Sequence, residues 1–118
     1  MNRDSLFKYA REQYKAEPEY LWDKLPGYAV LRHQDSEKWF ALVMNVPGTK
    51  LGLSDEAEVD ILEVKARPEH IGSLRKMDGI LPAYHMNKEH WISVLLSGPL
   101  TAKEIHNLLG ESYELTSR

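Results

Sequence analysis

Apolar runs of strand length constrain this chain more than any other feature. The two longest are Trp39–Met44 and Trp91–Leu96, and both are far too short to span a membrane as a helix. Val59–Lys65 is a further run rich in Val, Ile and Leu, and Tyr28–His33 is a shorter one. Such runs, separated by segments that contain Gly, Pro, Asn and Asp, are typical of β-strands. The sequence therefore predicts a sheet that contains at least these four segments.

Three other segments carry the signals of helices. Their apolar residues recur every three or four positions, and each segment begins with residues that suit a helix N-terminus. Thr101 and Glu104 have the spacing of a capping box, and Pro68 suits a first turn because no helical hydrogen bond is lost there. The predicted helices span residues 4–15 with Asn2 or Asp4 as the cap, residues 68–77, and the segment from Thr101 through Ser112.

The order of these elements predicts the fold class. A polar turn at residues 34–37 indicates a hairpin, residues 50–53 are predicted as a brief edge strand, and residues 81–88 as a loop or irregular strand. We expect an α+β fold, a mostly antiparallel sheet with helices packed on one face, in the order α-β-β-β-(β)-α-β-α. The 118 residues have the length of one domain and no linker divides them, so a single domain over residues 1–118 is predicted.

The sequence lacks the residues that several classes of function require. The absence of cysteine excludes disulfides, cysteine-zinc sites and thiol nucleophiles. The glycines are dispersed, no serine lies in a G-x-S-x-G turn, and the spacing of His85 and His90 fits no zinc motif. We therefore expect a protein that is not an enzyme, with no catalytic residues, metal or cofactor. No apolar run of signal-peptide length follows the N-terminus, which predicts a cytoplasmic protein without a membrane partner.

Charge is distributed unevenly along the chain. The net charge of −3 disfavours nucleic-acid binding, yet residues 1–64 carry 8 basic and 12 acidic groups, whereas residues 65–91 carry five basic and three acidic groups. The 65–91 segment also contains aromatic, amide and imidazole side chains, which suit contacts to bases and sugars. The plainer interpretation is that its cations are the usual complement of a helix C-terminus.

Four ordered motifs resemble one known family. Residues 81–94 read L-P-A-Y-H-M-N-K-E-H-W-I-S-V, which resembles the P-x-Y-H-M-N-K-x-H-W-I-x-V pattern of the MmcQ/YjbR family. Residues 39–43 resemble its central strand, residues 65–69 its K-x-x-P-E motif, and residues 112–115 its closing S-Y-x-L. The resemblance covers nearly the whole chain. It implies a compact α+β fold like that of CyaY, the bacterial frataxin, and DNA binding through a proposed double-wing surface.

One position departs from the family pattern. Many members place Asp before the proline of K-x-x-P-E, where its side chain caps the helix, and Arg67 stands there in this chain. The change removes a side-chain cap and adds a cation, so it weakens the helix start and raises the local basicity.

Together these features predict a non-enzymatic DNA-binding protein whose binding is weak and sensitive to salt. Lys and Arg side chains would neutralise phosphates, and Asn87 and His85 would reach sugar or base edges. The predicted contacts are Lys65, Arg67, Arg75, Lys76, His85, Asn87 and Lys88.

The sequence leaves several alternatives open. The Tyr84–Trp91 motif is either a recognition surface or a hydrogen-bonding network that holds an irregular loop. A second function is a protein- or small-ligand-binding adaptor, with Trp22 and Tyr84 in an exposed patch and Trp39 in the core. A third is cation binding at the acidic stretch 55–63, by analogy with frataxin-like folds, through Asp55, Glu56, Glu58 and Asp60.

Overall fold

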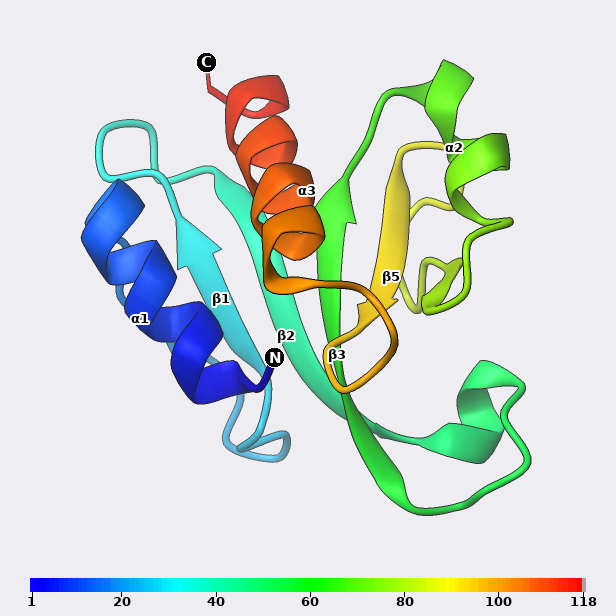
Figure 1. The fold of residues 1–118 in the computed structure, drawn as a ribbon. Helices are drawn as coiled ribbons and strands as arrows, with labels where there is room; N and C mark the ends of the chain where they lie inside the picture. The colour runs from blue at the N-terminus through cyan, green and yellow to red at the C-terminus, as the bar shows by residue number, and fades with distance from the viewer. Residues whose placement is uncertain (118) are drawn as a thin grey trace.

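The structure, a computed structural model, describes residues 1–117 and is built around one antiparallel sheet with strand order β1-β2-β3-β5-β4 (Figure 1). Helices α1 and α3 lie across one face of this sheet, and α2 lies beside α3 toward the β5 side (Figure 1). The predicted α+β fold with helices on one face is therefore confirmed. The elements are α1 (Arg3–Tyr14), β1 (Ala29–Arg32), β2 (Trp39–Pro47), β3 (Glu58–Lys65), α2 (Pro68–Leu74), β4 (Ile80–Pro82), β5 (Trp91–Leu95) and α3 (Ala102–Leu115).

The helix starts follow the capping residues in the sequence. Asn2 caps α1, with its side chain accepting a hydrogen bond from the Ser5 N–H at 2.9 Å, and Thr101 and Glu104 form the predicted capping box of α3. Helix α2 begins at Pro68 without a side-chain cap, as the departure at Arg67 predicts. No helix of the described residues is long and apolar enough to cross a membrane.

Helix α2 is shorter than predicted, since it ends at Leu74 rather than Met77. Beyond it, the Met77 N–H bonds the Leu74 carbonyl at 3.0 Å in a tight turn. Gly79 then adopts a φ of 92°, and a Cβ built there would lie 2.9 Å from Leu100 Cδ1. Residues other than glycine rarely adopt this φ, so the backbone conformation after the turn favours glycine at this position.

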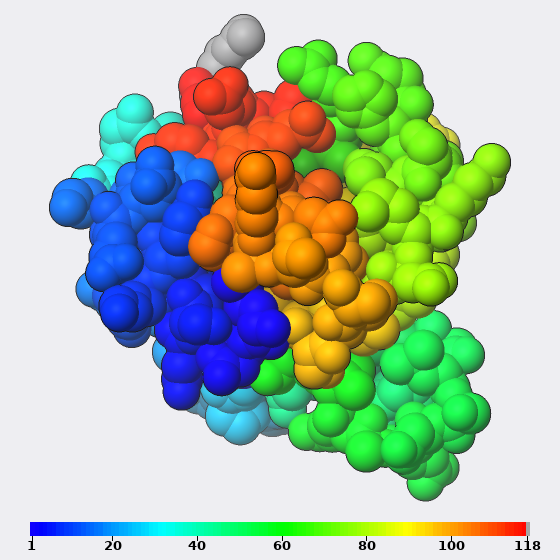
Figure 2. All heavy atoms as spheres, viewed as in Figure 1, coloured from blue at the N-terminus to red at the C-terminus, as the bar shows by residue number. Residues whose placement is uncertain are grey.

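Two further segments differ from the sequence prediction. The edge strand expected at residues 50–53 is wrong, because Gly48–Leu51 form a 3₁₀ helix, η1, followed by Gly52 at a φ of 83°. The β2–β3 connection turns back through this segment, which projects from the body of the molecule between residues 48 and 57 (Figures 1 and 2). Residues 80–82 form the short edge strand β4, and an irregular loop follows at residues 83–90, called the 83–90 loop below.

Apolar side chains form two layers, one on each face of the sheet. The larger layer lies under α1 and α3 and includes Leu6, Phe40, Leu62, Ile92 and Leu109. The smaller layer covers the opposite face, called the helix-free face, and contains Val30, Leu42, Met44, Val46 and Ile61. Loop residues rather than helices cover this second layer, chiefly Trp22, Tyr28, Tyr84 and Met86.

A bulge in β2 decides where Trp39 points. Leu31 pairs with Ala41 but Arg32 pairs with Trp39, so Phe40 is the extra residue. Both Phe40 and Ala41 contact the helix-side core, and Trp39 is shifted to the helix-free face, where it is half-buried. Its predicted place in the core is therefore wrong. Trp22, predicted to be the more exposed, is also half-buried and touches Trp39 edge-on with ring centroids 5.7 Å apart.

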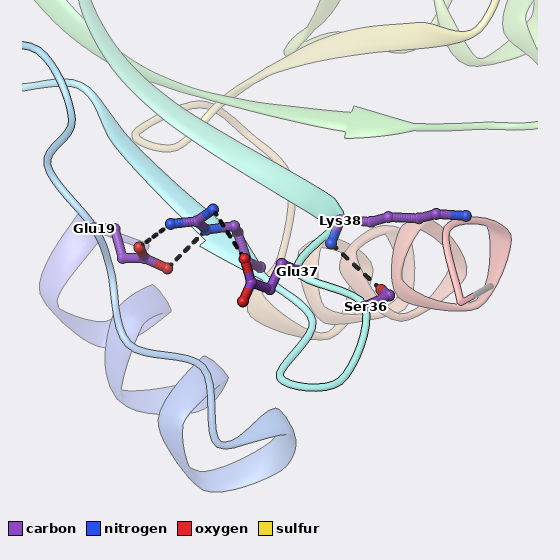
Figure 3. A network of polar contacts seen from close by, with 5 residues as sticks. Glu19, Ser36, Glu37 and Lys38 are labelled. Atoms are coloured by element: carbon purple, nitrogen blue, oxygen red, sulfur yellow. Dashed lines mark hydrogen bonds and ion pairs between the residues drawn. The ribbon is translucent and has the colours of Figure 1, made fainter.

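The open edge of β1 is covered by the chain that precedes it. Glu19 and Val30 exchange backbone hydrogen bonds of 3.0 and 2.9 Å, and the Glu19 carboxylate forms an ion pair with Arg32. Figure 3 shows this corner, including Glu37, which lies 4.0 Å from the same guanidinium. The Lys38 N–H donates to Ser36 Oγ at 3.3 Å, which orders the turn before β2 (Figure 3).

Candidate nucleic-acid interface

A cleft of about 1240 Å³ lies at the end of the sheet where β2 and β5 begin and β3 ends, the upper end in Figure 1. The C-terminal turns of α3 form its other side, and the end of α1 reaches it through Tyr14. The cleft brings together segments that are far apart in the sequence. Its charged and tryptophan lining residues are Lys38, Trp39, Lys65, Arg67, Trp91, Glu111 and Glu114.

Three cations line the strand side of the cleft and are called the basic wall. Lys38 precedes β2, Lys65 is the last residue of β3, and Arg67 is the N-cap residue of α2. Lys38 and Arg67 are exposed and Lys65 is half-buried. None of the three forms an ion pair with a carboxylate of residues 1–117. The basic wall therefore presents charge that these carboxylates leave available to an anion.

Two tryptophans lie on the helix-free face beside the basic wall. Lys65 and Trp91 are direct cross-strand partners, so their side chains share a face. Trp39 lies on the other side of β3, level with its end, because Ala41 pairs with Val64. Both indoles are half-buried. The arrangement places Lys65 between two aromatic rings on neighbouring strands.

The opposite side of the cleft is acidic. Glu111 is half-buried and Glu114 is exposed in the last turns of α3, and these two carboxylates are called the acidic wall. The C-terminal end of a helix also carries partial negative charge. The two walls of the cleft therefore have opposite signs.

Ser112 fixes the position of α3 relative to the strands that line the cleft. Its hydroxyl accepts a hydrogen bond from the Lys65 N–H at 2.8 Å and donates one to the Phe40 carbonyl at 2.6 Å. Ser112 is fully buried, so both bonds form away from solvent. One side chain thus ties α3 to β2 and β3 next to the residues that line the cleft.

A buried carboxylate anchors the 83–90 loop on the helix-free face. Glu63 is 0% exposed and pairs across the sheet with Leu42 and Ser93. Its carboxylate accepts hydrogen bonds from the Tyr84 N–H at 2.8 Å and from the Ser93 hydroxyl. Burial raises the pKa of the Glu63 carboxyl to about 7, against the opposing effects of these hydrogen bonds and of the Lys88 charge.

Asn87 stabilises the same loop internally. Its Oδ1 accepts from the Glu89 N–H at 2.8 Å, and its carbonyl accepts from the N–H groups of His90 and Trp91 at 3.2 and 2.9 Å. His85 has a φ of 60°, and its ring packs at a tilt against Tyr84. These contacts are those expected if the Tyr84–Trp91 motif builds the loop. They leave the exposed side chains of His85 and Lys88 available for recognition.

The sequence-predicted contact residues do not form one surface. Lys65 and Arg67 line the cleft, and His85, Asn87 and Lys88 lie on the 83–90 loop over the helix-free face. Arg75 and Lys76 follow α2, whose Ile71 packs into the helix-side core. The length of this helix, about 10 Å, separates the pair from Arg67.

Sequence reasoning missed the other three charged residues of the cleft. Lys38, Glu111 and Glu114 carry no distinctive motif, and only the packing of α3 across the sheet brings them to Lys65. The sequence predicts Trp39 in the core because it lies in an apolar central strand, and regular alternation cannot reveal the bulge at Phe40.

The acidic stretch 55–63 does not converge on one point. Asp55 accepts the Ala57 N–H at 2.9 Å, and Glu58 accepts from the Asn45 amide at 3.0 Å. Asp60 forms an ion pair with Arg3 at 2.8 Å. Within residues 1–117 no three His, Asp or Glu side chains are grouped so as to hold a metal ion.

Comparison with known proteins gives close relatives along the whole chain. The protein YyaQ of Bacillus subtilis is 47% identical over 116 residues, which cover 98% of each chain, and YjbR of Escherichia coli is 31% identical over 91 residues, 75% of each. A crystal structure of a protein from Pseudomonas syringae is 53% identical, with a TM-score of 0.96 over 98% of this chain and 99% of that one. The sequence model of the YjbR family matches residues 11–115. The chain therefore belongs to the YjbR family.

Proposed function

We propose that this protein binds DNA without catalysing a reaction on it, and that the cleft is its main contact surface. The observation that supports this is the juxtaposition of Lys38, Lys65 and Arg67 with Trp39 and Trp91. Lysine and arginine neutralise phosphates, and indole rings stack on bases of any sequence. The net charge of −3 keeps the affinity low and makes it dependent on these few cations.

The proposal narrows the predicted contacts to those that the cleft brings together. Lys65 and Arg67 are primary phosphate contacts, joined by Lys38. His85, Asn87 and Lys88 are secondary contacts, because they lie on the neighbouring 83–90 loop, whose His90 carbonyl accepts the Ala66 N–H at 2.9 Å. Arg75 and Lys76 lie at the far end of α2 and contribute little.

Charge reversal at the two ends of α2 tests this assignment. The double variant Lys65→Glu/Arg67→Glu should weaken binding of fluorescein-labelled 20-nucleotide DNA at about 50 mM salt by roughly tenfold or more. The slope of log affinity against log salt should also fall by about 2, because two phosphate contacts are lost. The measurement is fluorescence anisotropy with single-stranded and duplex DNA.

Arg75→Glu/Lys76→Glu is the matched control, because it changes the net charge by the same amount outside the cleft. It should retain most of the affinity, and thermal unfolding should show that both variants remain folded. The proposal fails if the unaltered protein at tens of micromolar binds neither DNA at about 50 mM salt. It also fails if the two double variants lose affinity equally.

A protein-binding role is the second candidate, and one observation favours it. Tyr20, Leu21 and Leu25 are 54%, 46% and 42% exposed in the segment before β1, beside the half-buried Trp22. Neighbouring exposed apolar side chains are typical of docking surfaces. Recovery of a partner protein after nuclease treatment, lost in the variant Leu21→Glu/Leu25→Glu, would support this role over DNA binding.

A further inference from the structure

The two walls of the cleft differ in charge, and this difference bears on which form of nucleic acid fits. The basic wall carries Lys38, Lys65 and Arg67, and the acidic wall carries Glu111 and Glu114 at the C-terminal end of α3. A duplex has a phosphate backbone on both sides of its bases. Any duplex that enters the cleft therefore places phosphates against carboxylates as well as against cations, and like charges at short range repel.

A single strand has the asymmetry that the cleft requires. Its phosphates lie along one side and its unpaired bases along the other. A single strand can therefore place its phosphates on the basic wall without bringing a second phosphate backbone to Glu111 and Glu114.

The tryptophans add a contact that only unpaired bases can make fully. Trp39 and Trp91 flank Lys65 on the helix-free face, with two strand spacings, roughly 10 Å, between their α-carbons. The edge-on contact of Trp22 with Trp39, at an interplanar angle of 89°, orients the Trp39 ring before any ligand arrives. Stacking on such rings requires bases that are unstacked and accessible, as they are in a single strand.

We infer that the cleft selects single-stranded nucleic acid over duplex, with the phosphates on Lys38, Lys65 and Arg67 and the bases against Trp91 and Trp39. This inference rests on the proposed function and goes beyond it by naming the form of the ligand. It also assigns a role to Glu111 and Glu114, which exclude the second backbone.

The test compares one mixed-sequence 20-nucleotide single strand with its duplex by fluorescence anisotropy at about 50 mM salt. The single strand should bind at least tenfold more tightly than the duplex. Duplex binding that equals or exceeds single-strand binding overturns the inference and leaves the proposed function standing. Binding of neither overturns the proposed function itself, so the two failures are distinguishable.

Reversing the acidic wall tests the mechanism of selection. The variant Glu111→Lys/Glu114→Lys should bind the duplex at least tenfold more tightly than the unaltered protein and so reduce the preference for the single strand. The matched control is Glu56→Lys/Asp78→Lys, which makes the same charge change at exposed positions outside the cleft. If both variants raise single-strand and duplex affinity by the same factor, only net charge matters and the inference is wrong.

Aromatic substitution tests the base contacts separately. Trp91→Leu should reduce single-strand affinity by tenfold or more, Trp91→Phe should restore part of it, and neither should change the duplex affinity. Tyr20→Leu is the control, since Tyr20 is an exposed aromatic residue that does not line the cleft. Thermal unfolding identifies a variant that has lost its fold. Equal loss of single-strand and duplex binding in a folded Trp91→Leu protein contradicts base stacking.

Discussion

The two faces of the sheet are covered by different kinds of structure. Under α1 and α3 the core is apolar and continuous, and Leu6, Ile105 and Leu109 are fully buried there. On the helix-free face, irregular segments cover a smaller apolar layer and enclose the carboxylate of Glu63. A helix satisfies its own backbone hydrogen bonds, whereas a loop must find partners elsewhere. The comparison shows why the buried polar anchor lies beneath the 83–90 loop and not beneath a helix.

Among residues 1–117, each face also contains one buried titratable side chain, and the two respond to pH in opposite directions. Burial raises the pKa of Glu63 on the helix-free face. On the helix side, burial lowers the pKa of His33, whose Nε2 lies 2.8 Å from Thr116 Oγ1 and whose ring packs against Phe40 and Tyr113. In both cases burial disfavours the charged form.

Truncation of the helix-side core should give the largest effect. Leu109→Ala removes a 0% exposed side chain from α3 and should lower the free energy of unfolding by about 2–5 kcal/mol, because a cavity forms under the helix. Chemical denaturation measures the change. Leu25→Ala, at a position 42% exposed, is the control and should cost less than about 1 kcal/mol. Similar losses of unfolding free energy in both variants would mean that the packing of α3 on this face contributes little to stability.

Removing the charge of Glu63 should give the next effect, on the helix-free face. A native pKa of about 7 against 4.5 unfolded means that the folded state holds the proton more tightly. This contribution is full below pH 4.5 and is lost as pH rises through about 7. Glu63→Gln should therefore be more stable than the unaltered protein at pH 8, by an amount on the order of 3 kcal/mol.

Unfolding at a series of pH values from 4 to about 8 checks this expectation, with the exposed Glu56→Gln as control. The Glu63→Gln protein should lose the fall in stability across this window, and the control should keep it. A Glu63→Gln protein with the original pH dependence would show that the carboxylate is not the group responsible.

His33 should contribute a smaller change of the opposite sign. Because its folded pKa is lowered, its contribution to stability is present above pH 6.5 and is lost as pH falls through the folded value. His33→Gln should reduce the loss of stability on the acid side. Part of the loss should remain in this variant, because burial also lowers the pKa of His106. The exposed His70→Gln is the control, and equal pH profiles for the two variants would contradict the assignment.

The smallest effect is expected at the β1 corner in Figure 3, where Arg32 pairs with Glu19 near the surface. Side-chain ordering and solvent screening offset most of the gain from such pairs. Arg32→Gln should shift the thermal unfolding midpoint less than the substitutions of Leu109, Glu63 and His33, and added salt should reduce even this difference. A large, salt-independent shift of the midpoint would show that the Arg32–Glu19 pair contributes more to stability than a partly exposed ion pair is expected to.

Patterns local in the sequence predicted most of the secondary structure. The capping residues Asn2, Thr101 and Glu104 mark the starts of α1 and α3, and the apolar runs became β1, β2, β3 and β5. The errors have local causes that a periodic pattern cannot reveal. They are the 3₁₀ turn at Gly48–Leu51, the tight turn after Leu74 and the bulge at Phe40.

The candidate site was only partly predictable. Lys65 and Arg67 lie in the cleft, as a basic segment with a phosphate role predicts, but Arg75 and Lys76 follow α2 and lie elsewhere. Residues close in the sequence do not always share a surface. Arg75 and Lys76 lie at the C-terminal end of α2, and the length of this helix separates them from the cleft. Lys38 and Glu111 join the site from distant segments that no local motif connects.

The sequence by itself therefore determined the elements, their order and the α+β class, because capping, apolar periodicity and turn residues act within a few positions of the chain. Only the tertiary structure decided that Trp39 faces away from the helices, that Glu63 is buried beneath the 83–90 loop, and that the cleft has walls of opposite charge. These properties depend on strand register, a bulge and the packing of α3, which are set by contacts between residues far apart in the chain.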